Sequence, residues 1–355
     1  MPHLSVVVPT YNRADTLEAC LQAVRASTFQ DYELIVVDCG SQDATCDIAR
    51  RYADRLIELQ GIPSRSAARN QGIASAQGEI MVNVDSDVVI QPSALARIAE
   101  HFAHHPEVDA LTGLLSKEHP NPNFFSQYKN LYMHYLHDAF GRLPQGATLA
   151  FVYGSIHAVR RQAIRPYGLV VRIADDLELG QQLAAEGKRI AFVRDLEVVH
   201  LKRHDALSLI KNDFHIPCDW AVVFIAYKGW KRLGRHGVGF GHARVEQILS
   251  IILAPLTALV ALVTSHDPSR VSWAVSLAVV WLLLNRRFIA FLAKERGVVF
   301  GVRGCVWTFF DHLVMAAGIL CGLVTAVLSR GGFYRRTTGD PRQTMPAPRS
   351  LLTGH

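Results

Sequence analysis

The sequence predicts an α/β domain with a mostly parallel sheet and helices on both of its faces, followed by an α-helical membrane domain. Three observations lead to this prediction. Short apolar runs alternate with helical patterns through about the first 90 residues. Polar or acidic residues follow several of these runs directly. Long apolar stretches then dominate residues 246–328, in a chain of 355 residues of which 50% are apolar.

The first elements alternate strand and helix. Residues 4–8 are a buried apolar run that Pro9–Asn12 closes. The expected strands are residues 4–8, 32–37, 56–59 and 79–84, and the expected helices are residues 15–27, 43–52 and 65–76. Right-handed crossovers then place the loops that follow the strands on one edge of the sheet. Ligands of open α/β sheets bind at that edge, so we expect Thr10, Asp38 and Asp85 to converge there.

The next hundred residues are less regular. The expected strands are residues 107–113, 151–159, 189–193 and 197–200, and the expected helices are residues 124–140 and 174–187. Asp175 and Asp176 open the second of these helices. Several histidines have spacings that permit metal binding, although surface or acceptor-pocket roles fit them better; they are His101, His104, His105, His134 and His137.

Three apolar segments predict membrane spans: residues 248–264, the shorter 271–284, and 306–328. A buried helical hairpin in a soluble protein is the alternative. Residues 216–230 resemble an interfacial helix with aromatic anchors. Basic residues precede the first span, which favours a cytoplasmic catalytic part; they are Lys228, Lys231, Arg232, Arg235 and Arg244. Three passes would leave the arginine-bearing tail outside, against the positive-inside rule, so the topology stays open.

These patterns divide the chain into four parts. Residues 1–210 form the expected catalytic domain, 211–245 an interfacial basic linker, 246–328 about three transmembrane helices, and 329–355 a disordered tail. Gly237–Gly241 follows no strand and predicts a flexible linker rather than a dinucleotide fingerprint.

Charge and cysteine content narrow the function classes. The formal net charge of +6 fits an anionic membrane surface or anionic substrates. No nucleic-acid reader motif accompanies it, so nucleic acid is not an expected partner. The six cysteines form no C-x-x-C pair, which suits a reducing compartment and argues against a zinc site or a disulfide framework.

The segment Asp85-Ser86-Asp87 is the most informative one. Two acids at the end of a buried strand are costly unless something pairs with them. A divalent cation that carries a diphosphate is a suitable partner, because hard cations take carboxylate and phosphate oxygens. An ordinary strand-end turn is the alternative.

Five ordered motifs together resemble the family 2 inverting glycosyltransferases with the GT-A fold, over roughly residues 4–205. They are Val6–Asn12, Val36–Ser41, Ala68–Gly72, Asp85–Asp87 and Asp175–Leu179. The resemblance implies that a loop from Pro9, Thr10, Tyr11 and Asn12, with Asp38, Gly40 and Ser41, cradles the nucleoside of a nucleotide-sugar. Cys39 stands where the family commonly has Asp or Asn, which puts base contacts through that side chain in doubt.

The resemblance also implies which residues bind the metal ion and the diphosphate. Asp87 is expected to bind Mg²⁺ or Mn²⁺, Asp85 to face the ribose or the metal, and His200 to approach the metal or serve as an edge histidine. Either Arg65 or Arg69, which are four apart on one helix face, could meet the diphosphate; an Arg–Asp pair on a solvated face is the alternative.

Asp176 matches the family's catalytic base, and Asp175 fills the place before it. Two adjacent carboxylates are expected to raise each other's pKa and so help one act as a base. Acids that complement the helix dipole are the alternative. The implied reaction is a single displacement with inversion, in which Asp176 takes the acceptor proton.

The resulting expectation is a multi-pass enzyme of the inner (cytoplasmic) membrane. It moves one sugar from a nucleotide-sugar, with a uridine donor mildly favoured, to a lipid or lipid-linked hydroxyl. No Gln-x-x-Arg-Trp run follows the acidic pair, so processive synthesis is not favoured. Residues 113–170 are expected to determine the specificity for the sugar and the lipid. The alternatives are a polyprenyl-phosphate glycosyltransferase and a non-catalytic nucleotide-binding membrane subunit.

Overall fold

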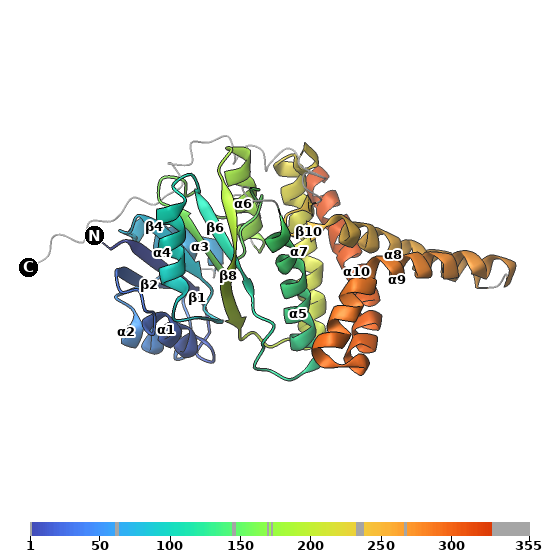
Figure 1. The fold of residues 1–355 in the computed structure, drawn as a ribbon, viewed down its shortest axis with the longest axis horizontal. Helices are drawn as coiled ribbons and strands as arrows, with labels where there is room; N and C mark the ends of the chain where they lie inside the picture. Colours follow the sequence, from blue (N-terminus) through green and yellow to red (C-terminus); the bar gives the residue numbers. More distant parts are fainter. Residues whose placement is uncertain are drawn as a thin grey trace, which may run out of the picture.

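Eight strands form one mixed sheet, and long helices stand against one end of it (Figure 1). The computed structural model describes residues 2–60, 64–143, 147–168, 170–171, 173–231, 238–265 and 268–328. The order across the sheet is β3-β2-β1-β4-β7-β6-β8-β5. The α/β fold predicted from the sequence is therefore confirmed.

The first four strands are parallel, as expected. They are β1 (Leu4–Thr10), β2 (Tyr32–Asp38), β3 (Arg55–Glu58) and β4 (Ile80–Val84). The register pairs Thr10 with Asp38, so these two strand ends lie side by side. Continuous Val, Ile and Leu runs suit strands that are buried on both faces.

The second half of the sheet mixes directions. β7 (Ile156–Arg160) runs antiparallel between β4 and β6 (Ala110–Leu115), β6 is parallel to β8 (Ile190–His200), and β5 (Val88–Ile90) is antiparallel to β8. Residues 189–193 and 197–200 thus belong to one strand instead of two. The β5–β8 register pairs Val88 with His200, which brings His200 beside Asp87.

Helices cover both faces of the sheet. Alternate residues of β1 point to opposite sides: Val6 and Val8 join the core around α1 (Leu17–Arg25), whereas Val7 packs with Ala68 of α3 (Arg65–Ser75). Gly72 permits this close approach, because a Cβ there would lie 2.3 Å from a Val7 methyl. The remaining helices of this part are α2 (Thr45–Tyr52), α4 (Ala94–His104), α5 (Phe124–Asp138), the short η1 (Ala139–Arg142) and α6 (Asp175–Ala185).

Four long helices follow. α7 (Ala206–Ala226) and η2 (Gly229–Lys231) precede α8 (Val245–Thr264), α9 (Pro268–Arg296) and α10 (Val298–Leu328). α8, α9 and α10 are long and apolar enough to cross a membrane. Figure 1 shows α8 and α9 projecting as a hairpin to the right, whereas α10 runs beside α7. The short span expected at 271–284 is part of a 29-residue helix.

The segment after α7 differs from the expectation. β9 (Val238–Phe240) and β10 (Ala243–Arg244) form an antiparallel pair, so the prediction of a flexible linker is wrong for these residues. Trp220 and Phe224 of α7 pack on Phe240 of this pair, with ring centroids 6.2 and 5.0 Å away, and therefore do not serve as lipid-facing anchors. The tail expected at 329–355 and residues 232–237 lie outside the described residues.

Candidate active site

Asp85 directly follows β4 and forms an ion pair with a buried arginine. Arg69 Nη2 donates to Asp85 Oδ1 at 2.7 Å, and Arg69 Nη1 donates to Asp175 Oδ1 at 2.7 Å. Arg69 Nε also donates to Asn83 Oδ1 at 3.0 Å. Its side chain is 1% exposed. Arg69 thus ties the strand end to the start of α6. It has the Arg–Asp pairing of the alternative offered by the sequence, but it is buried instead of lying on a solvated helix face.

Arg65 lies one turn earlier on α3 and is the second arginine that the sequence offered as a possible contact for the diphosphate. Its side chain is 41% exposed and its Nη2 lies 3.3 Å from Asp175 Oδ1. It lines the cavity described below. Of the two arginines, Arg65 is the one placed to meet a ligand.

Asp87 stands in a ring of cationic side chains. His200 Nε2 lies 3.5 Å from Asp87 Oδ1, and Arg13 Nη2 lies 3.9 Å from Asp87 Oδ2. Burial by itself raises the pKa of Asp87, but His200, Arg13 and Lys202 outweigh it and lower that pKa. Burial lowers the pKa of His200, although the charge of Asp87 opposes this shift.

The adjacent acids at the start of α6 have opposite environments. Burial raises the pKa of Asp175, but Arg69 and Arg65 outweigh it, so that pKa is lowered. Burial and the charge of Asp175 raise the pKa of Asp176. The expectation that the two acids raise each other's pKa is therefore wrong for Asp175. Asp175 is also fully buried, with Ser66 Oγ donating to it at 2.9 Å, and only Asp176 lines the cavity.

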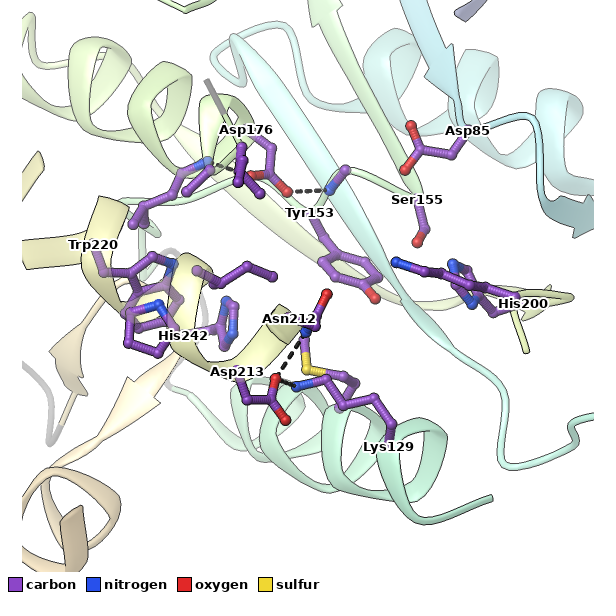
Figure 2. Close-up of a pocket in the computed structure, with 18 of the residues that line it drawn as sticks. Asp85, Lys129, Tyr153, Ser155, Asp176, His200, Asn212, Asp213, Trp220 and His242 are labelled. Atoms are coloured by element: carbon purple, nitrogen blue, oxygen red, sulfur yellow. Dashed lines mark hydrogen bonds and ion pairs between the residues drawn. The ribbon is translucent and has the colours of Figure 1, made fainter. Parts of the chain in front are cut away.

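Asp176 is oriented by two backbone amides. Gly154 N donates to Asp176 Oδ2 at 2.7 Å, and Leu177 N donates to Asp176 Oδ1 at 2.8 Å (Figure 2). Gly154 is needed here, since a Cβ at that position would lie 2.8 Å from the same carboxylate oxygen. A carboxylate with a raised pKa that faces a cavity can accept a proton from a bound molecule.

The loops after β1 and β2 brace each other. Asn12 N donates to Ser41 Oγ at 2.8 Å, and Gln42 N donates to Asn12 Oδ1 at 2.8 Å. Asp38 Oδ2 accepts from Gly40 N at 2.9 Å and from Ser41 N at 2.8 Å. Gly40 has a φ of +83°, which glycine adopts without strain. Asp38, Gly40, Ser41 and Asn12 therefore shape the loop, while Pro9, Thr10, Tyr11 and Cys39 line the cavity.

A cavity of about 680 Å³ extends from these strand-end loops to the long helices. Its polar end includes Arg13, Arg65, Asp85, Asp87, Asp176, His200 and Lys202. Its apolar end is formed by α7, α8, α10 and the β9–β10 pair, with Trp220, Phe224, Phe240, Ile248, Ile251, Ile319 and Leu323. Figure 2 shows Tyr153 between Asp176 on one side and Lys129 on the other. The cavity can thus hold a charged ligand and an apolar one end to end.

Known proteins are similar in sequence to part of the chain. Residues 5–168 match the family model described as "Glycosyl transferase family 2". The glycosyltransferase AglE of Haloferax volcanii is 38% identical over 94 residues, which are 24% of this chain and 31% of that protein. A PGL/p-HBAD biosynthesis glycosyltransferase of Mycobacterium tuberculosis is 34% identical over 121 residues, 32% of this chain and 46% of that protein. The matches thus span less than half of these relatives.

A solved structure extends the similarity to the whole fold. The mannosyltransferase PcManGT of Pyrobaculum calidifontis, in complex with GDP-Man and Mn²⁺, aligns with a TM-score of 0.55 and 21% identity. The alignment covers 93% of this chain and 88% of that one. Residues 5–168 are therefore similar to the family 2 glycosyltransferases, and the fold of the chain is GT-A.

The part of the chain that matches the family model ends before Asp175 and Asp176. The interpretation of these acids therefore depends on geometry: they open α6 beside Gly154 and Arg69, which both lie within the match. His200, on β8, is likewise placed by its pairing with β5 rather than by the family model.

Three functional candidates escaped the sequence analysis. Arg13 follows the Pro9–Asn12 motif directly and reaches Asp87 from the loop after β1. Lys129 on α5 is paired with Asp213 on α7, and both line the cavity opposite Asp176 (Figure 2). Arg13 could have been found from its place next to a nucleoside-type loop. The Lys129–Asp213 pair left no signal, because its partners are 84 residues apart.

Few side chains in the described part of the chain could bind a metal ion. No group of three or more His, Cys, Asp or Glu side chains there is arranged to hold a metal ion. Asp87 and His200 face each other, and Asp85 lies on the same wall, so they could share a cation with oxygens of a bound diphosphate. His134 Nδ1 donates to Leu115 O at 2.6 Å, and neither His134 nor His137 lines the cavity.

Proposed function

We propose that this chain is a membrane-bound, metal-dependent, inverting glycosyltransferase that moves one sugar from a nucleotide-sugar to a lipid or lipid-linked hydroxyl. The observation that carries the proposal is the continuous cavity, which has ionic groups at one end and walls from α8 and α10 at the other. A hydrophilic donor and an apolar acceptor both fit into it, and their reactive ends would meet near Asp176.

The donor belongs at the polar end. Pro9, Thr10, Tyr11 and Cys39 offer walls for a nucleoside, and Arg65 offers a guanidinium for the diphosphate. Asp87 and His200, with Asp85 beside them, are the residues that would hold Mg²⁺ or Mn²⁺. A cation there neutralises charge on the departing nucleoside diphosphate. Arg13 and Lys202 add positive charge to the same wall.

Asp176 is the proposed base. Its raised pKa and its position in the cavity wall suit proton removal from a hydroxyl near neutral pH. The acceptor oxygen bonds to the anomeric carbon as the bond from that carbon to the diphosphate breaks. The hydroxyl proton passes to Asp176, and the sugar leaves with inverted configuration. Arg69 and Asp175 are positioning residues, because Arg69 binds Asp85 and Asp175 together, and Asp175 directly precedes Asp176, while neither residue lines the cavity.

The acceptor end favours a lipid. Ile248, Ile251, Ile319 and Leu323 come from helices that are apolar enough to enter a membrane. An acceptor with a hydrocarbon chain would replace water along these side chains. The role in cell-envelope glycan or glycolipid synthesis follows from such an acceptor, and a cytoplasmic catalytic domain at the inner membrane would give the donor free access.

A donor screen on membranes that contain the full-length chain tests the proposal. Release of nucleoside diphosphate is measured for UDP- and GDP-sugars with Mg²⁺ or Mn²⁺, with and without extracted lipid. We expect one donor to be consumed, and consumption to rise when lipid is added. If donor consumption does not change when lipid is added, the proposed lipid acceptor is contradicted. If no donor is consumed, the result favours the alternative of a non-catalytic nucleotide-binding subunit.

A polyprenyl phosphate is the second acceptor that the cavity permits. Lys129 Nζ lies in the wall opposite Asp176 and could face a phosphate there. A phosphate oxygen is already ionised near pH 7 and needs no base, so Asp176→Asn would then keep near-normal turnover. Loss of turnover in that variant supports the hydroxyl acceptor.

A further inference from the structure

The direction of α10 relative to its neighbours has a consequence for membrane topology. α8 and α9 project away from the catalytic domain, whereas α10 runs along it beside α7 (Figure 1). We propose that only the α8–α9 hairpin crosses the bilayer, and that α10 lies in the plane of the membrane interface with one face in the hydrocarbon. The inference does not depend on the proposed transfer reaction.

The alignment of α7 and α10 is fixed by two glycines. A Cβ on Gly318 would lie 2.2 Å from Phe214 O, and a Cβ on Gly322 would lie 2.1 Å from Cys218 O. Each helix advances by four residues between these two contacts, so the axes are nearly parallel and point the same way. The second half of α10 therefore lies at the same level as the middle of α7.

α7 is not a transmembrane helix. Asp219 Oδ2 accepts from Ile173 N at 2.9 Å and from Ala174 N at 3.2 Å, which ties α7 to the loop before Asp175. Lys211 and His215, one turn apart on α7, are both exposed. Exposed basic side chains at mid-helix are costly in hydrocarbon. The aligned part of α10 cannot then pass through the middle of the bilayer.

The hairpin, in contrast, has the dimensions of a crossing. α8 and the part of α9 up to Asn285 are about 30 and 27 Å long at 1.5 Å per residue, close to the thickness of the hydrocarbon core. Asn285 Nδ2 donates to Ser250 Oγ at 3.0 Å, which places these two positions at the same end of the hairpin. Between Gln247 and Asn285 the only charged residues are Asp267 and Arg270, at the opposite end. Exposed Arg286 and Arg287 follow Asn285 and mark the catalytic side.

α10 carries an apolar stripe that needs a nonpolar medium. Exposed apolar side chains recur three or four residues apart in each half of the helix; they are Val299, Val302, Val306 and Phe310 in the first half, and Leu320, Val324 and Val327 in the second. Thr308, Asp311 and His312 lie on the opposite, buried face. At 31 residues α10 is about 46 Å long, which exceeds the hydrocarbon thickness by about half. An in-plane position covers the whole stripe with lipid at one depth.

The charge distribution agrees with two crossings. Five arginines follow residue 328 in the sequence: Arg330, Arg335, Arg336, Arg342 and Arg349. Three crossings would place them on the side opposite the catalytic domain, whereas two place them on the same side, as the positive-inside rule requires. The in-plane arrangement also sets Ile319 and Leu323, which line the cavity, at the level where an acceptor lipid can enter from the side.

Membrane depth along α10 tests the proposal. A nitroxide is attached through p-acetylphenylalanine at Val299, Val306, Leu320 or Val327, one site at a time, in the full-length protein in bilayers. Its collision rates with oxygen and with a water-soluble nickel complex report depth. We expect one shallow depth at all four sites. Labels at Leu249, Leu256 and Leu262 of α8 are the matched control, and Leu256 should be the deepest of these. A depth profile along α10 in which both ends are shallow and the middle is deep would overturn the inference.

The side of the membrane on which the C-terminus lies provides a second test, which uses the same unnatural amino acid. p-Acetylphenylalanine at Ser350 or Ser265 is exposed to a membrane-impermeant aminooxy dye in sealed vesicles of known orientation. We expect Ser350 to react from the side of the catalytic domain and Ser265 from the opposite side. Reaction of both positions from the side opposite the catalytic domain would show three crossings and refute the in-plane α10.

Discussion

The two ends of the cavity are built on different principles. At the polar end, where we propose that the donor binds (the donor end), three acids have cationic partners: Asp85 has Arg69, Asp175 has Arg69 and Arg65, and Asp87 has His200 and Arg13. At the apolar end, where we propose that the acceptor binds (the acceptor end), the walls are mostly apolar side chains of α7, α8 and α10. Directional ionic contacts fix the position and orientation of a small polar ligand, whereas apolar walls set only volume and shape.

This difference predicts where each kind of specificity lies. Donor recognition should be sensitive to single charge changes, because a buried charge that loses its partner is costly. Acceptor recognition should tolerate changes of chain length and respond gradually to side-chain size. Asp176 stands between the two ends and should affect the chemical step alone.

The largest effect is expected for Asp176→Asn. The amide oxygen can still accept from Gly154 N or Leu177 N, so fold and donor affinity are retained, while a base is lost. General bases contribute about 10²–10⁴-fold, so kcat should fall by that factor. Transfer rate and nucleotide affinity are measured side by side. Asp195→Asn, at a 79% exposed surface position, is the control, and it should be unchanged.

The next effect concerns stability at the donor end. Arg69→Met leaves Asp85 and Asp175 without their shared partner in a buried site, which should cost about 3–5 kcal/mol in free energy of unfolding. Arg65→Met removes a 41% exposed side chain, so it should leave stability nearly intact and weaken donor binding instead. Denaturant unfolding and nucleotide titration of both variants separate the two roles. Equal loss of stability in both variants would contradict them.

A smaller effect is expected at the acceptor end. Leu323→Ala removes three carbons from the cavity wall and should raise the acceptor KM by about tenfold, with donor affinity unchanged. Each fully buried methylene contributes about 0.8 kcal/mol, and the factor is reduced because Leu323 is 37% exposed. Leu282→Ala, on α9 and 43% exposed, is the matched control outside that wall. Transfer kinetics with a lipid acceptor at several concentrations give the comparison. A rise in donor KM instead would mean that Leu323 belongs to the donor end.

The two ends also differ in how far the sequence predicted them. Parallel strands 4–8, 32–37 and 79–84 have unmistakable apolar runs, so the convergence of Thr10, Asp38 and Asp85 at one edge could be foreseen. The choice between Arg65 and Arg69 could not, because both lie on one helix face. The rotation of α3 decides it, and that rotation is set by Gly72 against Val7.

The acceptor end was largely hidden from the sequence. The β9–β10 pair is short, and its residues Phe240 and His242 gain meaning only when they pack on Trp220. The inward direction of Trp220 also differs from the expected lipid-facing one, because an aromatic residue suits an interface and a cavity wall equally well. Long-range pairs such as Lys129 with Asp213 depend on how α5 meets α7, which periodicity does not show.

The smallest expected effect is a shift in the pH profile that measures coupling across the donor end. Burial and Asp175 raise the pKa of Asp176, whereas Arg65 lowers it. Arg65→Gln removes the lowering charge, so that pKa should rise further. Because the base must be deprotonated to act, the acidic limb of kcat at saturating donor should move to higher pH, by less than about one unit given the partial exposure of Arg65. Arg97→Gln, at a 42% exposed site paired with Asp195, should leave the limb in place. A limb that moves to lower pH in Arg65→Gln would mean that another group, and not Asp176, titrates in the chemical step.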